Sequence, residues 1–276
     1  MSADTRAIGA TRTGSRASFA ISDGWVLTKR NLISYVRKPD LLVFSTIQPV
    51  MFVLLFVYVF GGAIEQILPK TIPYVDFLMP GIFVQTAIFT ATQTGVGLAD
   101  DLKKGLVDRF RSLPMARSAV LSGRTLADGV AILFQTLLML GVAVLVGFRF
   151  HAGSLRAILA IAGVLSIGYA FTWIFAFAGL TLKSVEAVQA ASFTVIFPFV
   201  FASSAFVPDT SFPGWLQAWS RVNPVSIWVE TARLLTLGGL YQGHGALLTH
   251  MLQSTAWFLG ILVVFVPLSV RVYRRT

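Results

Sequence analysis

The sequence predicts an all-α integral membrane protein with six transmembrane helices. Of the 276 residues, 55% are hydrophobic and only 12% are charged, whereas soluble domains carry about 25% charged residues. The apolar residues also fall into blocks of about 20, the length that a helix needs to cross a hydrocarbon layer about 30 Å thick. Helices are expected because an open sheet edge would leave backbone groups without hydrogen bonds in lipid.

Six apolar blocks are long enough to cross the membrane. They occupy residues of about 41–60, 76–98, 125–148, 157–182, 186–207 and 252–271. The second block has the weakest hydropathy because it is rich in Thr, Gln and Gly, but it must cross if the flanking charges are to alternate between the two sides. The chain therefore divides into a tail with an amphipathic segment, 1–40, and a six-span domain, 41–276.

The basic residues indicate the orientation, because Lys and Arg are enriched in cytoplasmic loops. Segments 1–40 and 99–124, the turn at Lys183 and the C-terminal tail hold seven, six, one and three of them. The opposite side holds five, namely Lys70, Arg149, Arg156, Arg221 and Arg233. We therefore expect both termini in the cytoplasm and residues 65–72 and 208–245 outside. Topology and anionic lipid explain the net charge of +10, so nucleic acid is not an expected partner.

The segment before the first span has an amphipathic pattern. Residues 18–38 place Ile21, Trp25, Leu32 and Val36 on one helical side. This predicts a helix lying in the cytoplasmic membrane interface. The alternative is a flexible basic leader.

A second amphipathic segment lies between the second and third spans. Residues 100–117 (DDLKKGLVDRFRSLPMAR) place Leu and Phe at helical spacing and a dense mixture of charges elsewhere. We expect a short cytoplasmic helix that ends at Pro114. Its charged face suits docking of another protein, and the alternative is a solvated loop helix held against lipid head groups.

The stretch 208–251 contains the signals of two short helices. Asn223-Pro224 predicts a helix start and Gly238-Gly239 a helix stop. Trp and Tyr residues also gather here, as they do at membrane interfaces. We expect short helices at or dipping into the outer interface rather than a folded outer domain.

Several functional classes lack their motifs. No G-x-x-x-x-G-K-[ST] loop occurs, so the chain is not expected to hydrolyse ATP or to be an enzyme by itself. No cysteine, H-E-x-x-H or G-x-S-x-G is present, so neither a thiolate metal site nor a membrane hydrolase is expected. The acids near the spans, including Asp76 and Asp128, lie at span ends, and Asp128 follows Arg124 by one turn. This disfavours a proton-coupled secondary transporter, which stays an alternative together with a membrane anchor that transports nothing.

The run DDLKKGLVDRFRSLPMARSAVLSGRTLAD, 100–128, resembles the conserved cytoplasmic loop of bacterial ABC exporter permeases of the second type. It is closest to the daunorubicin/doxorubicin-resistance permeases, chiefly through GLVDRFRSLP and RSAVLSGR. NPVSIWVETAR after the fifth span is similar too, so the resemblance covers nearly the whole chain and makes 41–276 a permease domain. Related permeases often have glutamate where Asp108 stands, a departure that keeps the charge.

The resemblance implies a subunit of an ATP-driven exporter in the bacterial plasma membrane. Its partners would be two copies of an ABC ATPase, which would hold ATP and Mg, and a second permease, either identical or a sister chain. This chain would bind no cofactor. The cargo would be a hydrophobic or amphipathic drug or lipid, or alternatively a glycolipid or lipid-linked polymer. The implied ATPase-coupling residues are Asp101, Lys104, Gly105, Asp108, Arg109, Arg111, Pro114 and Arg117.

Two stripes are candidates for the cargo path. Thr86, Thr90 and Gln93 follow one side of the second span, and Phe193 and Phe197 follow one side of the fifth. A polar stripe beside an aromatic one suits an uncharged or weakly cationic amphipathic molecule. The alternative is ordinary helix packing, for which Thr, Gln and Gly are also common in membranes.

Overall fold

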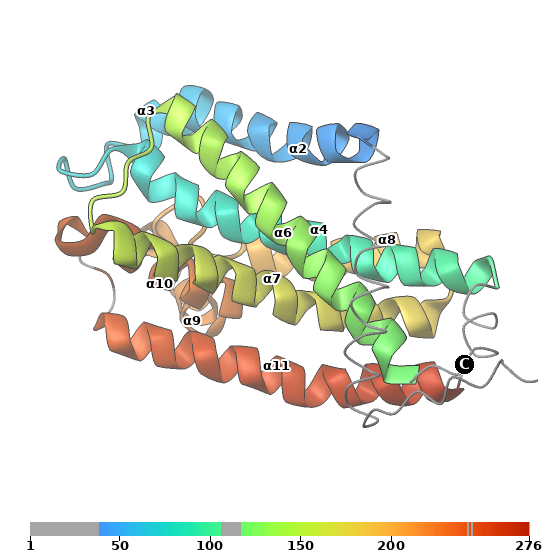
Figure 1. The fold of residues 1–276 in the computed structure, drawn as a ribbon. Helices are drawn as coiled ribbons and strands as arrows, with labels where there is room; N and C mark the ends of the chain where they lie inside the picture. Colours follow the sequence, from blue (N-terminus) through green and yellow to red (C-terminus); the bar gives the residue numbers. More distant parts are fainter. Residues whose placement is uncertain (1–38, 106–116, 242, 244, 276) are drawn as a thin grey trace, which may run out of the picture.

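The computed structural model describes residues 39–105, 117–241, 243 and 245–275, and this part of the chain is helical (Figure 1). Among these described residues, five helical segments are long and apolar enough to cross a membrane. The elements are α2 (Pro39–Leu54), the π-helix η1 (Leu55–Phe60), α3 (Gly61–Ile64), α4 (Tyr74–Lys103), α6 (Arg117–Val146), α7 (Ser154–Leu182), α8 (Val185–Phe201), η2 (Asp209–Ser211), α9 (Gly214–Val222), α10 (Pro224–Leu237), η3 (Gly238–Leu240) and α11 (Leu247–Arg275).

Five of the six expected spans correspond to described helices long enough to cross a membrane, the first formed by α2, η1 and α3 in succession, and the fifth corresponds to the shorter helix α8. The ends of several helices differ from the ends of the predicted apolar blocks. Helix α4 continues to Lys103 and α6 begins at Arg117, so both extend beyond the apolar blocks into charged sequence. Hydropathy marks only the part of a helix that lies in lipid, whereas 30 residues at 1.5 Å each exceed the hydrocarbon thickness.

The fifth span is shorter than expected, because α8 ends at Phe201 rather than near 207. The amide of Asn223 donates hydrogen bonds to the carbonyls of Phe199 (2.7 Å) and Ala202 (3.4 Å). These bonds satisfy carbonyls of the last turn that have no partner within the helix. The chain then turns back into the bundle.

Helices α4 and α7 form the centre of the bundle and pack more extensively on each other than any other pair. Their backbones meet at Gly95 and Gly179, where a methyl group on either glycine would overlap the opposite backbone. Such close approach is the role of small residues between membrane helices. It also explains the weak hydropathy of the second span, because α4 is the most buried of the spans and faces protein more than lipid.

The remaining spans surround this pair (Figure 1). Helix α6 crosses α4 and α7 obliquely, while α2 and α11 lie along opposite edges. Both edge helices expose large apolar side chains, among them Met51 on α2 and Val263 on α11. Apolar surface of this kind suits lipid or another membrane subunit rather than water.

The short helices before the last span follow the expected start and stop. The Asn223 side chain accepts a hydrogen bond from the Val225 amide at 2.9 Å, Pro224 is the first residue of α10, and Gly238 has a φ of 58° after its last turn. All residues of α10 are buried, whereas α9 exposes Trp215. Helix α10 therefore enters the bundle, and Arg233, expected in an outer loop, lies inside it.

The expected interfacial helix, 18–38, and most of the expected short helix, 100–117, lie outside the described residues. The first four residues of the latter are not a separate element, because they form the last turn of α4.

Candidate functional site

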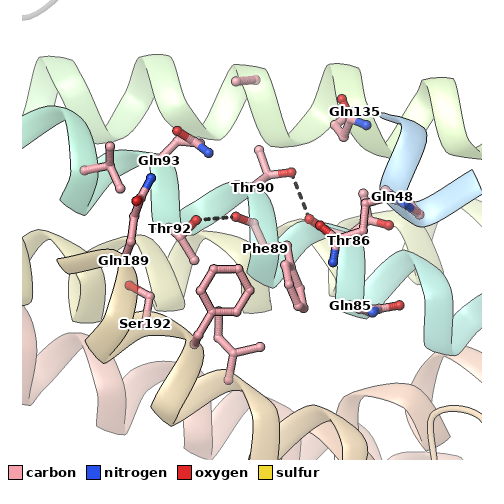
Figure 2. Close-up of a pocket in the computed structure, with 15 residues that line it drawn as sticks. Gln48, Gln85, Thr86, Phe89, Thr90, Thr92, Gln93, Gln135, Gln189 and Ser192 are labelled. Atoms are coloured by element: carbon pink, nitrogen blue, oxygen red, sulfur yellow. Dashed lines mark hydrogen bonds between the residues drawn. The ribbon is translucent and has the colours of Figure 1, made fainter. Parts of the chain in front are cut away.

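A pocket of about 240 Å³ lies between α2, α4, α6 and α8 (Figure 2). We call it the four-helix pocket. Its walls combine amide, hydroxyl and aromatic side chains with a few aliphatic ones. The lining residues are Gln48, Pro49, Gln85, Thr86, Phe89, Thr90, Thr92, Gln93, Val96, Ala131, Gln135, Gln189, Ser192, Phe193 and Ile196.

Three buried polar atoms of this pocket have no hydrogen-bond partner among the described residues. They are Gln85 Oε1, Thr86 Oγ1 and Ser192 Oγ, and each residue is at most 3% exposed. By contrast, Thr90 donates to the Thr86 carbonyl at 2.8 Å and Thr92 to the Phe89 carbonyl at 2.7 Å. An unsatisfied buried polar group costs about 1–3 kcal/mol, so three beside one cavity indicate a place where a ligand or water supplies partners.

The structure brings together four of the five residues expected along the cargo path. Thr86, Thr90, Gln93 and Phe193 line the four-helix pocket. Phe197 does not, because its ring stacks on Phe201 with centroids 4.3 Å apart.

Several polar lining residues do not belong to the two predicted stripes. Gln48 on α2, Gln85 on α4, Gln135 on α6 and Gln189 on α8 all line the pocket. Each glutamine lies within or at the edge of an apolar block, which is a usable signal because an amide in lipid requires a partner. Their convergence depends on helix packing that the sequence does not reveal.

Phe197 belongs to an aromatic cluster that joins α2 to the end of α8. Phe56 and Phe206 stack with centroids 4.6 Å apart, and Phe52 lies 5.8 Å from Phe201. Aromatic pairs add about 0.5–1.5 kcal/mol to the effect of burial. This cluster therefore fixes the α2 wall of the four-helix pocket.

At one end of the bundle, a second polar group joins α4 to α6. We call Thr94, Asp101, Arg124 and Asp128 the α4–α6 clasp. Arg124 Nη1 lies 2.5 Å from Asp101 Oδ2, and Arg124 Nε lies 3.7 Å from Asp128 Oδ2. Asp128 also accepts a hydrogen bond from Thr94 at 2.6 Å. The expected pairing of Arg124 with Asp128 is confirmed. The contact between Arg124 and Asp101 joins the end of α4 to the start of α6.

Of the expected ATPase-coupling residues, only part can be placed. Asp101 lies in the clasp, and Gly105, which follows the C-cap residue of α4, has a φ of 64°. Lys104 lies on the surface, where its hydrogen bond to Asp100 at 2.6 Å and the nearby carboxylate charge raise the pKa of its ammonium group. Arg117 begins α6. The remaining members, Asp108, Arg109, Arg111 and Pro114, lie outside the described residues.

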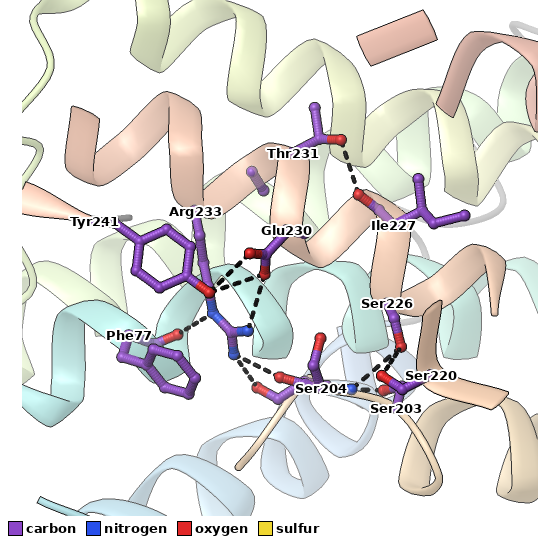
Figure 3. A network of polar contacts seen from close by, with 12 residues as sticks. Phe77, Ser203, Ser204, Ser220, Ser226, Ile227, Glu230, Thr231, Arg233 and Tyr241 are labelled. Carbon is purple, nitrogen blue, oxygen red and sulfur yellow. Dashed lines mark hydrogen bonds and ion pairs between the residues drawn. The ribbon is translucent and has the colours of Figure 1, made fainter. Parts of the chain in front are cut away.

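At the opposite end of the bundle, Arg233 on α10 is completely buried (Figure 3). Its Nε donates to the Phe77 carbonyl at 2.9 Å, and its Nη2 donates to the carbonyls of Ser204 (2.7 Å) and Ala205 (3.0 Å). We call these residues, with Glu230 and Tyr241, the Arg233 network. The guanidinium lies over the Phe77 ring, 3.5 Å from its centroid.

Glu230 supplies the negative charge of this network. Its Oε2 lies 3.7 Å from Arg233 Nη1, and both carboxylate oxygens lie 2.9 Å from the Tyr241 hydroxyl. Arg233 thus links α4, the segment after α8 and α10 through one cation. A buried charge with this many partners is a structural fastener.

Another polar cluster, centred on Asp76, lies at the same end of the bundle as the Arg233 network. Asp76 at the start of α4 accepts a hydrogen bond from the Arg149 amide at 2.9 Å and lies 2.8 Å from His151 Nε2. The His151 amide donates to the Thr236 carbonyl of α10 at 2.8 Å. Asp76 was expected at a span end, and it connects α4 to the α6–α7 loop and, through His151, to α10.

The fold defines a multi-pass helical membrane protein with an uncharged pocket between its spans. Residues 23–237 match the family model described as ABC-2 type transporter, and the chain belongs to this family. It is 33% identical over 245 residues to the daunorubicin resistance ABC transporter permease protein DrrB1 of Streptomyces coeruleorubidus, which covers 89% of this chain and 83% of that protein. It is 29% identical over 255 residues to the "Probable doxorubicin resistance ABC transporter permease protein DrrC" of Mycobacterium tuberculosis, covering 90% and 87%.

Family membership identifies the chain as a permease subunit of an ABC transporter. Permease subunits of this family are not themselves enzymes, and the family in general implies an ABC ATPase partner. The resemblance found in residues 100–128 is thereby confirmed.

Proposed function

We propose that this permease exports uncharged or weakly cationic amphipathic compounds, drugs or lipids, and that the four-helix pocket is part of their path. The observation that carries the proposal is the set of three unpartnered polar atoms on Gln85, Thr86 and Ser192 in a pocket with no charged lining residue among those described. Ligand pockets typically combine apolar walls with a few placed polar groups. The names of the two drug-resistance relatives support a drug rather than a polymer as cargo.

The pocket is small for a complete cargo site. Drug-sized ligands occupy pockets of about 300–1,000 Å³, and this one measures about 240 Å³. Its lining residue Phe193 is exposed on α8, as are Met51 on α2 and Phe197 on α8. We infer that a second permease, identical or a sister chain, packs on this face and completes the cavity.

The clasp end of the bundle is the proposed ATPase side. Residues 100–117 would contact the two ATPase copies, which would hold ATP and Mg, with Asp101, Lys104 and Gly105 at the edge of the contact. Both termini would then be cytoplasmic in a bacterial plasma membrane, and α10 would lie toward the outside. The excess of Lys and Arg at this end supports the orientation.

The cargo proposal is tested in proteoliposomes that contain this chain with its ATPase. A matched pair of compounds is compared, a neutral amphipathic alcohol and its permanently charged quaternary ammonium analogue. We expect the neutral compound to stimulate ATP hydrolysis and to be transported, because no counter-charge lines the pocket to replace the water around a cation. Equal or better transport of the quaternary compound would contradict the proposal.

The orientation is tested separately, because the chain has no cysteine. Single cysteines at 70 and 105 are labelled on intact cells with an impermeant thiol reagent. Labelling at 70 alone is expected, and labelling at 105 alone would reverse the topology.

The coupling role of the 100–117 segment is tested by reversing the charge of Asp108 or Arg111. We expect weaker ATPase association or turnover. Removing one member of a buried charge pair in an interface costs about 2–5 kcal/mol of binding free energy, whereas changing a charge at the rim costs much less. Normal assembly and transport in both variants would leave the segment as a solvated loop.

A further inference from the structure

A second cavity lies at the α10 end of the bundle, between α9, α10 and the first two turns of α11, and measures about 330 Å³. Its floor is buried and polar. It comprises the hydroxyls of Ser204, Ser220 and Ser226, the Glu230 carboxylate and the His250 imidazole. The hydroxyl groups of Ser220 and Ser226 lie 3.1 Å apart, and Figure 3 shows both beside Ser204.

The rim of this cavity carries groups of both charges. Arg221 at the end of α9 is exposed, and Asp209 is half-buried. Thr249 and Gln253 of α11 complete the rim with uncharged polar groups. A negative group at the rim would meet Arg221 with complementary charge. A positive group at the floor would share the Glu230 carboxylate with Arg233 Nη1, which lies 3.7 Å from Oε2, and with the Tyr241 hydroxyl.

The depth of the cavity in the membrane follows from α11. This helix has 29 residues, about 44 Å at 1.5 Å each, which exceeds the hydrocarbon core and matches the thickness that includes head groups. The lining positions 249, 250 and 253 lie in its first two turns. The cavity is therefore level with lipid head groups on the α10 side.

An exposed apolar stripe leaves the cavity along α11. Leu248, Leu252, Leu259 and Val263 recur at helical spacing and are all exposed. Leu248 and Leu252 are the immediate neighbours of the rim residues Thr249 and Gln253. Hydrocarbon chains attached to a head group in the cavity would lie along this stripe.

We propose that the cavity binds one phospholipid whose head group ends in a primary ammonium. The ammonium would reach Glu230 and the serine hydroxyls, the phosphate would pair with Arg221, and the acyl chains would follow α11. This order, from floor to rim to stripe, is the order of ammonium, phosphate and chains in such a lipid. A primary ammonium donates three hydrogen bonds, whereas a trimethylated one donates none, so the hydroxyl-rich floor selects the former.

The proposal does not depend on what the protein transports, and it is tested by binding alone. Purified, delipidated permease is titrated with phosphatidylethanolamine, phosphatidylcholine and phosphatidylglycerol in detergent, and bound lipid is counted by native mass spectrometry. We expect phosphatidylethanolamine to bind at least about tenfold more tightly than either of the other two lipids, which is the effect of one charge-assisted hydrogen bond.

Variants locate the site. Glu230→Gln and Arg221→Gln should each weaken phosphatidylethanolamine binding by roughly tenfold, and Glu65→Gln, at an exposed glutamate outside the cavity, should not. Arg221 is exposed and outside the Arg233 network, so its variant keeps the test valid if Glu230→Gln fails to fold. Equal binding of the three lipids, or no effect of Arg221→Gln, would overturn the proposal. Binding of free O-phosphoethanolamine as tight as that of the lipid would overturn the assignment to a lipid.

Discussion

The Arg233 network and the four-helix pocket both bury polar groups in an apolar bundle, but they resolve the cost differently. Around Arg233, Nε and Nη2 donate to the carbonyls of Phe77, Ser204 and Ala205. Its Nη1 makes no hydrogen bond among the described residues but lies 3.7 Å from the Glu230 carboxylate. In the pocket, Thr86 and Ser192 hold buried oxygens that have no partner among the described residues. A cation held by several carbonyls and a carboxylate fixes the position of helices, whereas uncharged oxygens beside a cavity leave hydrogen-bonding capacity for a ligand. Stability and cargo recognition should therefore respond to different substitutions.

The largest loss of stability is expected from Arg233→Met. Removing the cation leaves the Glu230 carboxylate buried without its charge partner and three carbonyls without donors, and breaking a buried pair costs about 3–5 kcal/mol. Folded protein, measured by fluorescence-detected gel filtration and thermal unfolding, should fall sharply. Arg149→Met is the matched control, because Arg149 is exposed and its contact with Asp76 uses the backbone amide. Similar losses in both variants would remove the fastening role of Arg233.

A smaller effect is expected from Arg124→Gln in the α4–α6 clasp. Its carboxylate partners Asp101 and Asp128 lose a charge-assisted hydrogen bond and an ion pair. Because Arg124 is partly exposed, we expect about 1–2 kcal/mol of destabilisation, near the lower end for bonds to charged groups. The clasp holds together the two ends of the segment proposed to dock the ATPase, so ATPase turnover should fall more than cargo binding does. If Arg124→Gln leaves ATPase turnover unchanged, the α4–α6 clasp has only a structural role.

Asn223→Ala should cost about 1 kcal/mol, the usual value of an N-cap. The side chain caps α10 through the Val225 amide and closes α8 through the Phe199 carbonyl. Asn223→Ser keeps a capping oxygen and should recover part of the stability in the same thermal unfolding measurement. No recovery would assign the effect to the α8 contact instead.

The sequence predicted the helical class, the six spans and the start of α10 because these depend on local signals, namely apolar block length and the Asn223-Pro224 cap. It failed where the outcome depends on the environment. The polar residues of the second span lowered its hydropathy and made it the weakest predicted span. Helix α4 tolerates these residues because protein rather than lipid surrounds it. Arg233 was counted as an outer-loop charge because hydropathy cannot show that α10 turns back into the bundle.

The candidate site shows the same division. Thr86, Thr90 and Gln93, predicted on one helical stripe, all line the pocket, since residues three or four apart share a face. Phe197 follows its own stripe but faces the Phe201 cluster instead of the pocket. The tie between Arg124 and Asp101 spans 23 residues, and no local pattern indicates which acid an arginine will reach across two helices.

The central claim is that the four-helix pocket is open for cargo, and the pair Thr86→Val and Thr136→Val tests it most directly. Both threonines are 1% exposed and both hydroxyls are without a partner among the described residues, but only Thr86 lines the pocket. Neither substitution should lower thermal stability, since each removes an unsatisfied hydroxyl without changing shape.

The deciding measurement is the equilibrium affinity of both variants for the neutral compound that most stimulates ATP hydrolysis in the reconstituted complex. Thr86→Val should bind it roughly tenfold more weakly, the effect of about one hydrogen bond, and Thr136→Val should bind it as the unaltered protein does. Equal affinity of the two variants would contradict the account and leave the polar stripe of α4 as helix packing.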